Sequence, residues 1–352
     1  MNRGLDTLIF FVTSRCNARC RTCFYWEELN QPNDLTFEEI ERLAATMPRF
    51  AEIWLSGGEP TLRPELSEIV SLFHRRNGVR SINLPTNGVL PWRIVEQIEA
   101  IRRLAPGMRI NLNLALDGFA ETHDRIRGVP GNFERALESL EALEALRLKD
   151  RELRVHVNSV VCSENLDEML PLADFIRQRF DLDGHYFQVI RGEPMDPVLL
   201  HLHQKSLEDL YAGLRPLYRH YATKIRRGEN TFAAYLKRAY YLGALELYHR
   251  TQLANLEQHT RWPMACTAGE TILVLDANGD LRACELREKL GNLRDFDCNW
   301  KAFWASRARS EETRAIARDG CWCTHVCFLH ASLKASPKAL AVDVPRAYLA
   351  QA

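Results

Sequence analysis

The amino-acid sequence predicts an α/β fold, namely a partial (β/α)6 TIM-like barrel followed by a helical bridge and a small C-terminal domain with a β-hairpin and many cysteines. Short apolar or β-branched runs alternate with longer segments in which apolar residues recur every three or four positions. This alternation is typical of parallel strands covered by helices. A helical stretch without strand signals follows, and a turn-containing, cysteine-rich segment comes after it.

Six strands and five intervening helices are expected in the barrel. The strands are Thr7–Thr13, Glu52–Ser56, Ser81–Pro85, Arg109–Leu116, Arg154–Val161 and Gly184–Ile190. The helices are Thr36–Met47, Glu65–Arg76, Trp92–Leu104, Asn132–Leu148 and Asn165–Arg179. Thr36 and Asn132 mark helix starts, each with Glu in the first turn. Six units fall short of the eight that close a barrel, and chemistry is expected just after the carboxyl end of each strand.

In the rest of the chain, the sequence pattern predicts two long helices and one hairpin. The helices are Leu199–Tyr221 and Phe232–Leu256, and the hairpin pairs Thr271–Leu275 with Leu281–Cys284. We therefore expect a barrel domain over 1–197, a helical bridge over 198–262, a cysteine-rich domain over 263–334 and a tail over 335–352.

Charge and hydropathy exclude several classes of partner. The chain has 352 residues, and 46 basic residues balance 46 acidic ones, which gives no reason to expect nucleic acid or an anionic membrane as a partner. No apolar stretch approaches the ~20 residues of a membrane span. The early apolar run Leu8–Val12 is too short for a secretory signal. We expect a cytoplasmic protein, a setting that disfavours disulfides between the ten cysteines, so metal ligation is the better default.

Cys16, Cys20 and Cys23 form a C-x3-C-x2-C pattern directly after the first predicted strand. Three thiolates on one loop can hold three irons of a cubane cluster and leave the fourth iron open to a cofactor or substrate. Half of a zinc site completed by distant cysteines is the alternative, but zinc ribbons usually pair two C-x2-C units. The pattern favours an iron–sulfur cluster.

With that loop, Gly57-Gly58-Glu59-Pro60 after the second strand and His123–Gly128 further on, the sequence resembles the radical S-adenosylmethionine (SAM) superfamily. The resemblance implies a [4Fe–4S] cluster on the three cysteines and SAM as cofactor. The SAM-binding residues that it implies are Phe24, Gly57, Gly58, Glu59, Pro60, Arg127 and Asn158.

Each implied SAM contact also has a chemical reason. Two glycines let the backbone come close, and Glu59 with exposed carbonyls suits the ammonium of the methionine. Arg127 offers a bidentate fork for the carboxylate; its alternative is a surface arginine beside Asp124. Asn158 is a ribose contact or else a satisfied core amide.

Two positions depart from the family pattern. Thr22 stands where relatives often carry an aromatic residue, and Phe24 and Tyr25, which directly follow Cys23, are expected to pack near the adenine instead. Ala115 stands where relatives often have Ser, so more of the carboxylate binding falls on Arg127.

Cys266 and Cys284, separated by a segment with Gly279 at its turn, resemble the opening of the SPASM and twitch auxiliary-cluster domains. The resemblance implies an auxiliary [4Fe–4S] cluster. Cys327 is the third expected ligand, and either Cys321 or Cys323 is the fourth. One auxiliary cluster is the economical count, although full SPASM domains hold two.

The two other cysteines and a histidine near these patterns are not expected to bind metal. A hydrogen-bonded histidine is favoured over a ligand at His325. Cys162 and Cys298 are expected to be ordinary buried thiols.

The resemblance implies an enzyme that reductively cleaves SAM to a 5′-deoxyadenosyl radical, which abstracts hydrogen from a substrate C–H bond, with the auxiliary cluster in electron transfer. No further catalytic side chain is assigned. The substrate is a ribosomal peptide, as for maturases, or a small-molecule, sugar or lipid intermediate. Expected partners are a reductant such as flavodoxin or ferredoxin and a separate peptide-recognition protein. The alternative, a non-catalytic zinc or iron–sulfur interaction protein, explains the cysteines but not the segment Gly57–Pro60.

Overall fold

One sheet of nine strands forms the centre of the computed structural model, which describes residues 4–226, 229, 231–257, 260–320 and 322–351. The strand order is β6-β5-β4-β3-β2-β1-β7-β8-β9. The six parallel barrel strands are β1 (Thr7–Thr13), β2 (Glu52–Gly57), β3 (Ser81–Thr86), β4 (Arg109–Ala115), β5 (Leu153–Val161) and β6 (Gly184–Val189). The predicted partial (β/α)6 barrel is confirmed.

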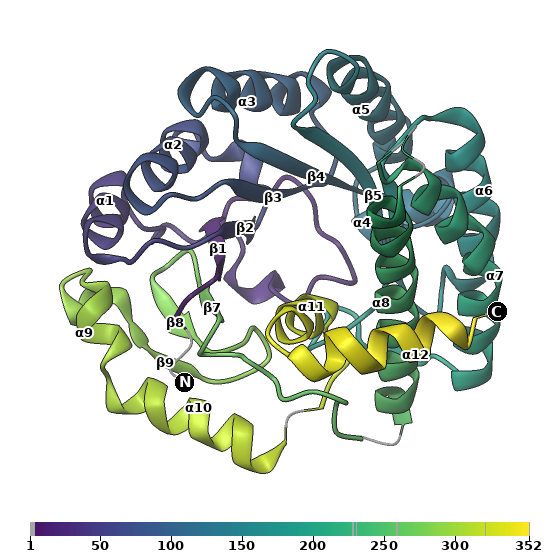
Figure 1. Cartoon of the computed structure of the whole chain (residues 1–352). Coiled ribbons are helices and arrows are strands. Elements are labelled where there is room, and N and C mark those ends of the chain that lie inside the picture. Colours follow the sequence, from purple (N-terminus) through teal and green to yellow (C-terminus); the bar gives the residue numbers. More distant parts are fainter. Residues whose placement is uncertain (1–3, 227–228, 230, 258–259, 321, 352) are drawn as a thin grey trace.

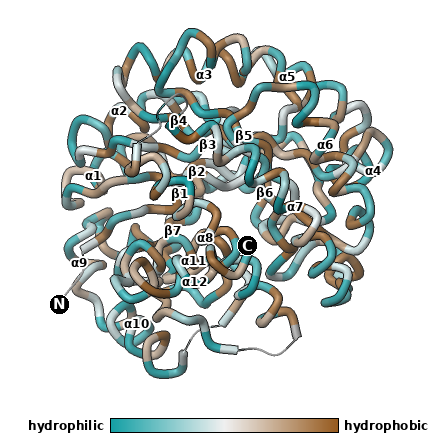
Figure 2. Tube along the Cα trace, turned by 45° about the vertical axis from the view of Figure 1, so that its right-hand side comes forward, coloured by the Kyte–Doolittle hydropathy of each residue, from teal (hydrophilic) through white to brown (hydrophobic). Residues whose placement is uncertain are grey.

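Helices cover the outside of these strands (Figure 1). They are α1 (Phe37–Thr46), α2 (Leu66–Asn77), α3 (Pro91–Leu104), α4 (Ala120–Arg127), α5 (Asn132–Arg147) and α6 (Met169–Arg179). Hydrophilic and hydrophobic stretches alternate along them, as expected for helices with one face on the sheet and one in solvent (Figure 2). The short helix α4 was not among the predicted helices.

The side chains of β4 show how the strands separate an apolar layer from a polar interior. Ile110, Leu112 and Leu114 are fully buried under the helices, and each such side chain contributes about 1.5–3 kcal/mol. The alternate residues Asn111 and Asn113 are half-buried and face into the barrel. On this strand, the side that faces the barrel interior is therefore polar.

Helices α1 and α5 both start where the sequence predicts, but only Thr36 caps its helix with its own side chain. Thr36 forms a capping box, in which its side chain accepts from the Glu39 N–H. The Asn132 side chain is buried and turned toward His123. Asp124 accepts hydrogen bonds from backbone N–H groups at this helix start instead.

The C-terminal hairpin continues the barrel sheet. Strand β7 (Ile272–Leu275) pairs in parallel with β1 and antiparallel with β8 (Asp280–Arg282). The hairpin was expected, but its pairing with β1 and the additional strand β9 (Lys289–Asn292) were not. The cysteine-rich segment is thus attached beside the first barrel strand.

The helical bridge consists of α7 (Gln204–Lys224) and α8 (Phe232–Glu257). Helix α7 begins later than predicted, because Pro197–Leu200 form a separate 3-10 turn with Asp196 as its cap. The described residues after the bridge also form the α-helices α9 (Trp300–Trp304), α10 (Arg307–Asp319), α11 (Val326–Lys334) and α12 (Val344–Leu349). No helix in the described part of the chain is long and apolar enough to cross a bilayer.

Candidate active site

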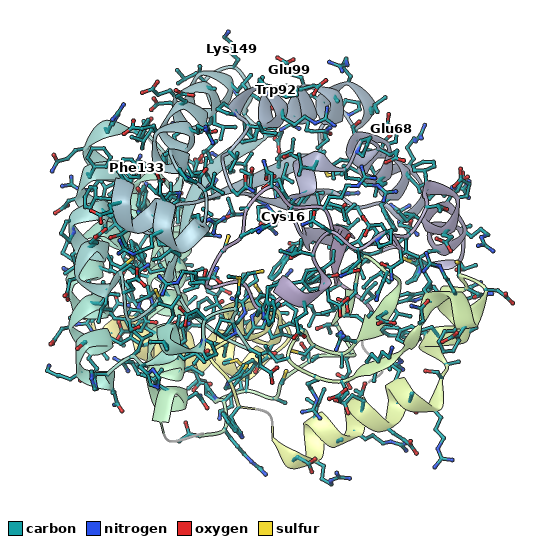
Figure 3. The ribbon with its side chains drawn as sticks, turned by 180° about the vertical axis from the view of Figure 1, so that it is seen from behind. Cys16, Glu68, Trp92, Glu99, Phe133 and Lys149 are labelled. Carbon is teal, nitrogen blue, oxygen red and sulfur yellow. The ribbon has the colours of Figure 1, made fainter. Side chains whose placement is uncertain are left out.

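The three N-terminal cysteines line a cavity at the carboxyl ends of the barrel strands. The cavity has a volume of about 260 Å³. Its lining includes Cys16, Cys20 and Cys23 together with Phe24, Gly57, Gly58, Glu59, Pro60, Asn87, Ala115, Arg127, Asn158 and Arg191. Cys16 lies near the middle of the ring of strands, far from Glu99 and Lys149 at the periphery (Figure 3). All the implied SAM-binding residues thus border one cavity with the three cysteines.

Glycine is required at positions 57 and 58 because the end of β2 runs against the cysteine loop. Gly57 has a φ of +112°, and a Cβ there would lie 2.2 Å from the Thr13 carbonyl oxygen. A Cβ on Gly58 would lie 2.1 Å from the Arg15 carbonyl oxygen. The Gly58 and Glu59 N–H groups donate to these two carbonyls, each over 2.8 Å. The glycines therefore hold the cysteine loop against the second strand.

Glu59 is buried at the edge of the cavity. Its carboxylate accepts hydrogen bonds from the Thr61 hydroxyl over 2.6 Å and from the Asn87 N–H over 2.7 Å. Burial raises the pKa of Glu59, and the hydrogen bonds from Thr61 and Asn87 oppose this shift. Each carboxylate oxygen has two lone pairs, so capacity for a further donor remains.

Arg127 lies inside the site and not at the surface. Its side chain is 11% exposed, and Nη1 donates to Oδ2 of the fully buried Asp117 over 3.1 Å. Its Nε is buried and has no hydrogen-bond partner among the described residues. The surface pairing with Asp124 is therefore not formed, and the guanidinium keeps donor capacity beside the cysteines.

Helix α4 is joined to the cysteine loop as closely as β2 is. The Arg19 N–H donates to the Arg127 carbonyl over 3.1 Å, and the Arg21 N–H donates to the Ile126 carbonyl over 2.8 Å. Gly128, with a φ of +65°, ends the helix, and a Cβ there would lie 2.5 Å from the Arg19 carbonyl oxygen. The segment His123–Gly128 is thus a wall of the cysteine site.

The three thiols occupy a site that disfavours an uncompensated negative charge. Burial raises the pKa of Cys16 to about 12 and that of Cys23 to about 11. Arg127 acts in the opposite direction on all three cysteines. Bound iron would supply the missing positive charge, because metal ligation replaces the thiol protons. The donor set and its burial therefore fit a thiolate-bound cluster.

Within the described ranges, no three Cys, His, Asp or Glu side chains converge closely enough to hold one metal ion. A cubane needs less convergence, since each thiolate binds a different iron.

A second cavity of about 670 Å³ continues from the first into the barrel, and Ser56, Pro85, Asn158, Gln188 and Arg191 border both. One wall carries carboxamides from the strands, and the other carries aromatic and polar residues from the bridge and α11. These residues are Asn83, Asn111, Asn113, Tyr218, Tyr240, Tyr241, Tyr248, His249, Gln252, Cys327 and His330. The volume lies within the range of small-ligand sites.

Within the described part of the chain, the side chain of Asn158 is not a satisfied core amide. Its Oδ1 is buried without a hydrogen-bond partner among the described residues. The side chain stands where the two cavities meet.

The C-terminal cysteines lie in the packed cluster formed by residues of β1, β7, α8 and α11. Cys284 is buried in it, and Cys266, Cys323 and Cys327 pack against it, as do Cys23 and Phe24. Cys321 lies outside the described residues. Cys162 and Cys298 are both buried, as expected. Four of the five expected ligands are thus placed in one region.

His325 is a hydrogen-bonded histidine, as expected. Its fully buried Nε2 lies 2.5 Å from Oε2 of Glu285, which in turn lies 3.4 Å from Nη2 of Arg191. The sequence interpretation missed both Glu285 and Arg191. Their positions were informative, because Glu285 directly follows Cys284 and Arg191 follows the end of β6.

Comparisons with known proteins agree with this geometry. Residues 10–176 match the model of the radical SAM superfamily. The AdoMet-dependent heme synthase of Methanosarcina barkeri is 31% identical over 195 residues, which cover 53% of this chain and 52% of that protein. The chain thus spans about half the length of this relative. The mycofactocin maturase MftC of Mycobacterium ulcerans is 27% identical over 334 residues, which cover 90% of this chain and 81% of that protein.

A solved structure shows the same fold. Native anSMEcpe with bound AdoMet and Kp18Cys peptide aligns with a TM-score of 0.62 at 15% identity, over 97% of this chain and 99% of that one. The family match runs from within β1 to within α6 and includes the three-cysteine loop and the glycine segment packed against it. On these grounds, residues 10–176 of the chain form a radical SAM domain.

Proposed function

We propose that this protein is an enzyme that reductively cleaves SAM and uses the resulting radical to abstract hydrogen from a substrate C–H bond. The observation that carries the proposal is that Cys16, Cys20, Cys23, Glu59 and Arg127 border one cavity, which opens into a larger chamber. A cofactor held in the first cavity would face a substrate in the second.

The roles of the protein residues follow from their positions. The three thiolates would hold the cluster, and Glu59 and Arg127 would bind the ammonium and carboxylate of the methionine. When bound and reduced, the cluster and SAM together supply the 5′-deoxyadenosyl radical. Phe24 would pack near the adenine and Asn158 would contact the ribose. The chamber, lined by carboxamides and by aromatic and aliphatic side chains, would orient the target carbon and exclude bulk water from it.

A second [4Fe–4S] cluster in the C-terminal region is part of the proposal. It would be bound by Cys266, Cys284, Cys327 and either Cys321 or Cys323. The placement of four of these residues in one packed region supports it. The cluster would transfer electrons to or from the substrate side, since Cys327 borders the chamber. The functional parts would then be the barrel (1–197), the bridge (198–262) and the cluster domain (263–334).

A peptide segment is the substrate class that we favour. The relative that aligns with most of the chain is named a maturase, and the solved neighbour was captured with a peptide. The carboxamides of Asn83, Asn111 and Asn113 line the chamber and can both donate to and accept from peptide groups. Flavodoxin or ferredoxin would supply the electron, and a separate protein would recognise the peptide.

Anaerobic reconstitution with iron and sulfide tests the central claim. We expect about eight irons per chain, the content of two cubanes, and formation of 5′-deoxyadenosine when dithionite and SAM are added. Bound zinc together with unreacted SAM would support the non-catalytic alternative instead. Peptides encoded by neighbouring genes, assayed by mass spectrometry for loss of hydrogen, test the substrate class.

A further inference from the structure

Arg191 connects the two cysteine regions. Its guanidinium carbon lies 5.0 Å from the centre of the ring of Phe24, which directly follows Cys23. Its Nη2 lies 3.4 Å from Oε2 of Glu285, which directly follows Cys284. The side chain is 16% exposed and borders both cavities. One cation therefore lies between the two proposed clusters.

The backbone after β6 holds this side chain in place. The Met195 N–H donates to the Cys23 carbonyl over 3.0 Å, and the Asp196 N–H donates to the Arg21 carbonyl over 2.9 Å. At Gly192, which has a φ of +69°, a Cβ would lie 3.1 Å from both Phe24 and Leu286. The loop thus runs through a narrow gap between the two cysteine-bearing segments.

The hydrogen-bond and ion-pair partners of the Arg191 guanidinium are distant, so they neutralise its positive charge only in part. Its Nη1 lies 3.4 Å from Oε1 of Gln188, and its Nε is buried with no partner among the described residues. The closer partner of Glu285 is His325, at 2.5 Å. Arg191 and the expected ligand Cys327 both border the larger cavity.

We propose that the positive charge of Arg191 raises the reduction potential of the C-terminal cluster. The inference rests on the second cluster of the proposed function. Reduction adds one electron and hence one negative charge to a cluster, and a fixed buried cation stabilises that state. Nearby charge, hydrogen bonds and solvent exposure are the means by which a protein tunes such potentials. Arg191 raises the potential of this cluster, whereas the carboxylate of Glu285 lowers it.

The experiment isolates the C-terminal cluster in the full chain. Cys16, Cys20 and Cys23 are replaced by Ala, so that only this cluster is titrated electrochemically under EPR detection. In this background Arg191→Gln is compared with Arg191→Lys, which keeps the charge. Arg215→Gln is the matched control, because it also removes one cation, but from a partly exposed side chain whose buried partner Glu246 keeps a second pair with Arg250.

We expect Arg191→Gln to lower the reduction equilibrium constant at least tenfold, which is about 59 mV for one electron. Arg191→Lys should retain most of the potential, and Arg215→Gln all of it. Glu285→Gln should move the potential in the opposite direction, which tests the sign even if Arg191→Gln does not fold.

The experiment distinguishes failure of this inference from failure of the proposed function. If the triple cysteine variant binds about four irons and has the same reduction potential with Arg, Gln or Lys at position 191, the inference is overturned. If the triple variant binds no iron while the unaltered chain binds about four, the second cluster of the proposed function fails, and the inference fails with it.

Discussion

Gly58 and Arg15 approach so closely that a Cβ on Gly58 would lie 2.1 Å from the Arg15 carbonyl oxygen. The sequence interpretation assigned the glycines to close approach of the cofactor. The structure adds a second reason, because the same glycines let the end of β2 contact the loop of Cys16, Cys20 and Cys23. The shape of the cysteine loop thus depends on a residue outside it.

Replacing Gly58 by Ala should distort this loop. Because the clash is with backbone atoms, we expect a loss of at least ~1–3 kcal/mol in the free energy of unfolding, together with less iron bound at the N-terminal site. Gly4→Ala is the control, since nothing lies within 4 Å of a Cβ there. Thermal unfolding and iron analysis of the two variants make the comparison. Equal iron content and stability would show that the contact is dispensable.

Removing the three loop cysteines should abolish SAM cleavage. We expect the triple variant Cys16→Ala, Cys20→Ala, Cys23→Ala to form no 5′-deoxyadenosine and to keep the C-terminal cluster, because the two ligand sets are separate. Cys162→Ala, which alters a buried thiol outside both sets, should still cleave SAM. Retained 5′-deoxyadenosine formation in the triple variant would refute the assignment of the cluster.

Arg127 should contribute directly to SAM affinity. Arg127→Gln is expected to weaken binding by about 1.5–3 kcal/mol, the usual contribution of a hydrogen bond to a charged group. The control is Arg125→Gln on the same helix, whose side chain pairs with Glu164 and is 44% exposed. Equilibrium binding of SAM to reconstituted protein measures both. Since Asp117 loses its partner in Arg127→Gln, circular dichroism must first show that this variant is folded. Equal affinities in the two folded variants would remove Arg127 from the cofactor site.

Loss of the C-terminal ligands should separate cleavage from turnover. We expect Cys266→Ala with Cys284→Ala to remove about four irons, to retain at least part of the uncoupled SAM cleavage and to lose substrate turnover. Cys298→Ala is the control, because this buried thiol is not an expected ligand. Size exclusion and circular dichroism should first confirm folding. A folded double variant with a full iron content or normal product would contradict the proposed cluster.

His185 should make stability depend on pH. Burial lowers its pKa to about 3, so the folded protein resists protonation, whereas the unfolded chain takes up a proton near pH 6.5. Its stabilising contribution is present above pH 6.5 and is lost as the pH falls toward 3, by about 1.4 kcal/mol per pH unit. His185→Gln should reduce this slope, and His203→Gln, at an exposed position, should not. Urea unfolding between pH 7 and 4 measures the slopes. The same slope in His185→Gln as in the unaltered chain would contradict the expectation.

Local patterns predicted the barrel well. Each of the six predicted strands ends within one residue of the observed strand, because continuous apolar runs reflect burial between helices. The cysteine loop and the glycine segment were also readable, since they are short motifs at strand ends. Relationships between distant residues were not. Two contacts have no local sequence signature: the pairing of Glu285 with His325, and the hydrogen bonds of Asp124 at the start of α5. Both join residues that come together only when the chain folds back on itself.

The parallel pairing of β1 with β7 has a consequence for how the protein is made. Strand β1 leaves the ribosome well before β7; it pairs on one side with β2 but must wait for the segment Ile272–Leu275 before its other side is satisfied. Until then the growing chain carries an open sheet edge of the kind that invites wrong pairing and aggregation. Truncation before β7 therefore exposes the barrel itself and does not simply remove a C-terminal attachment.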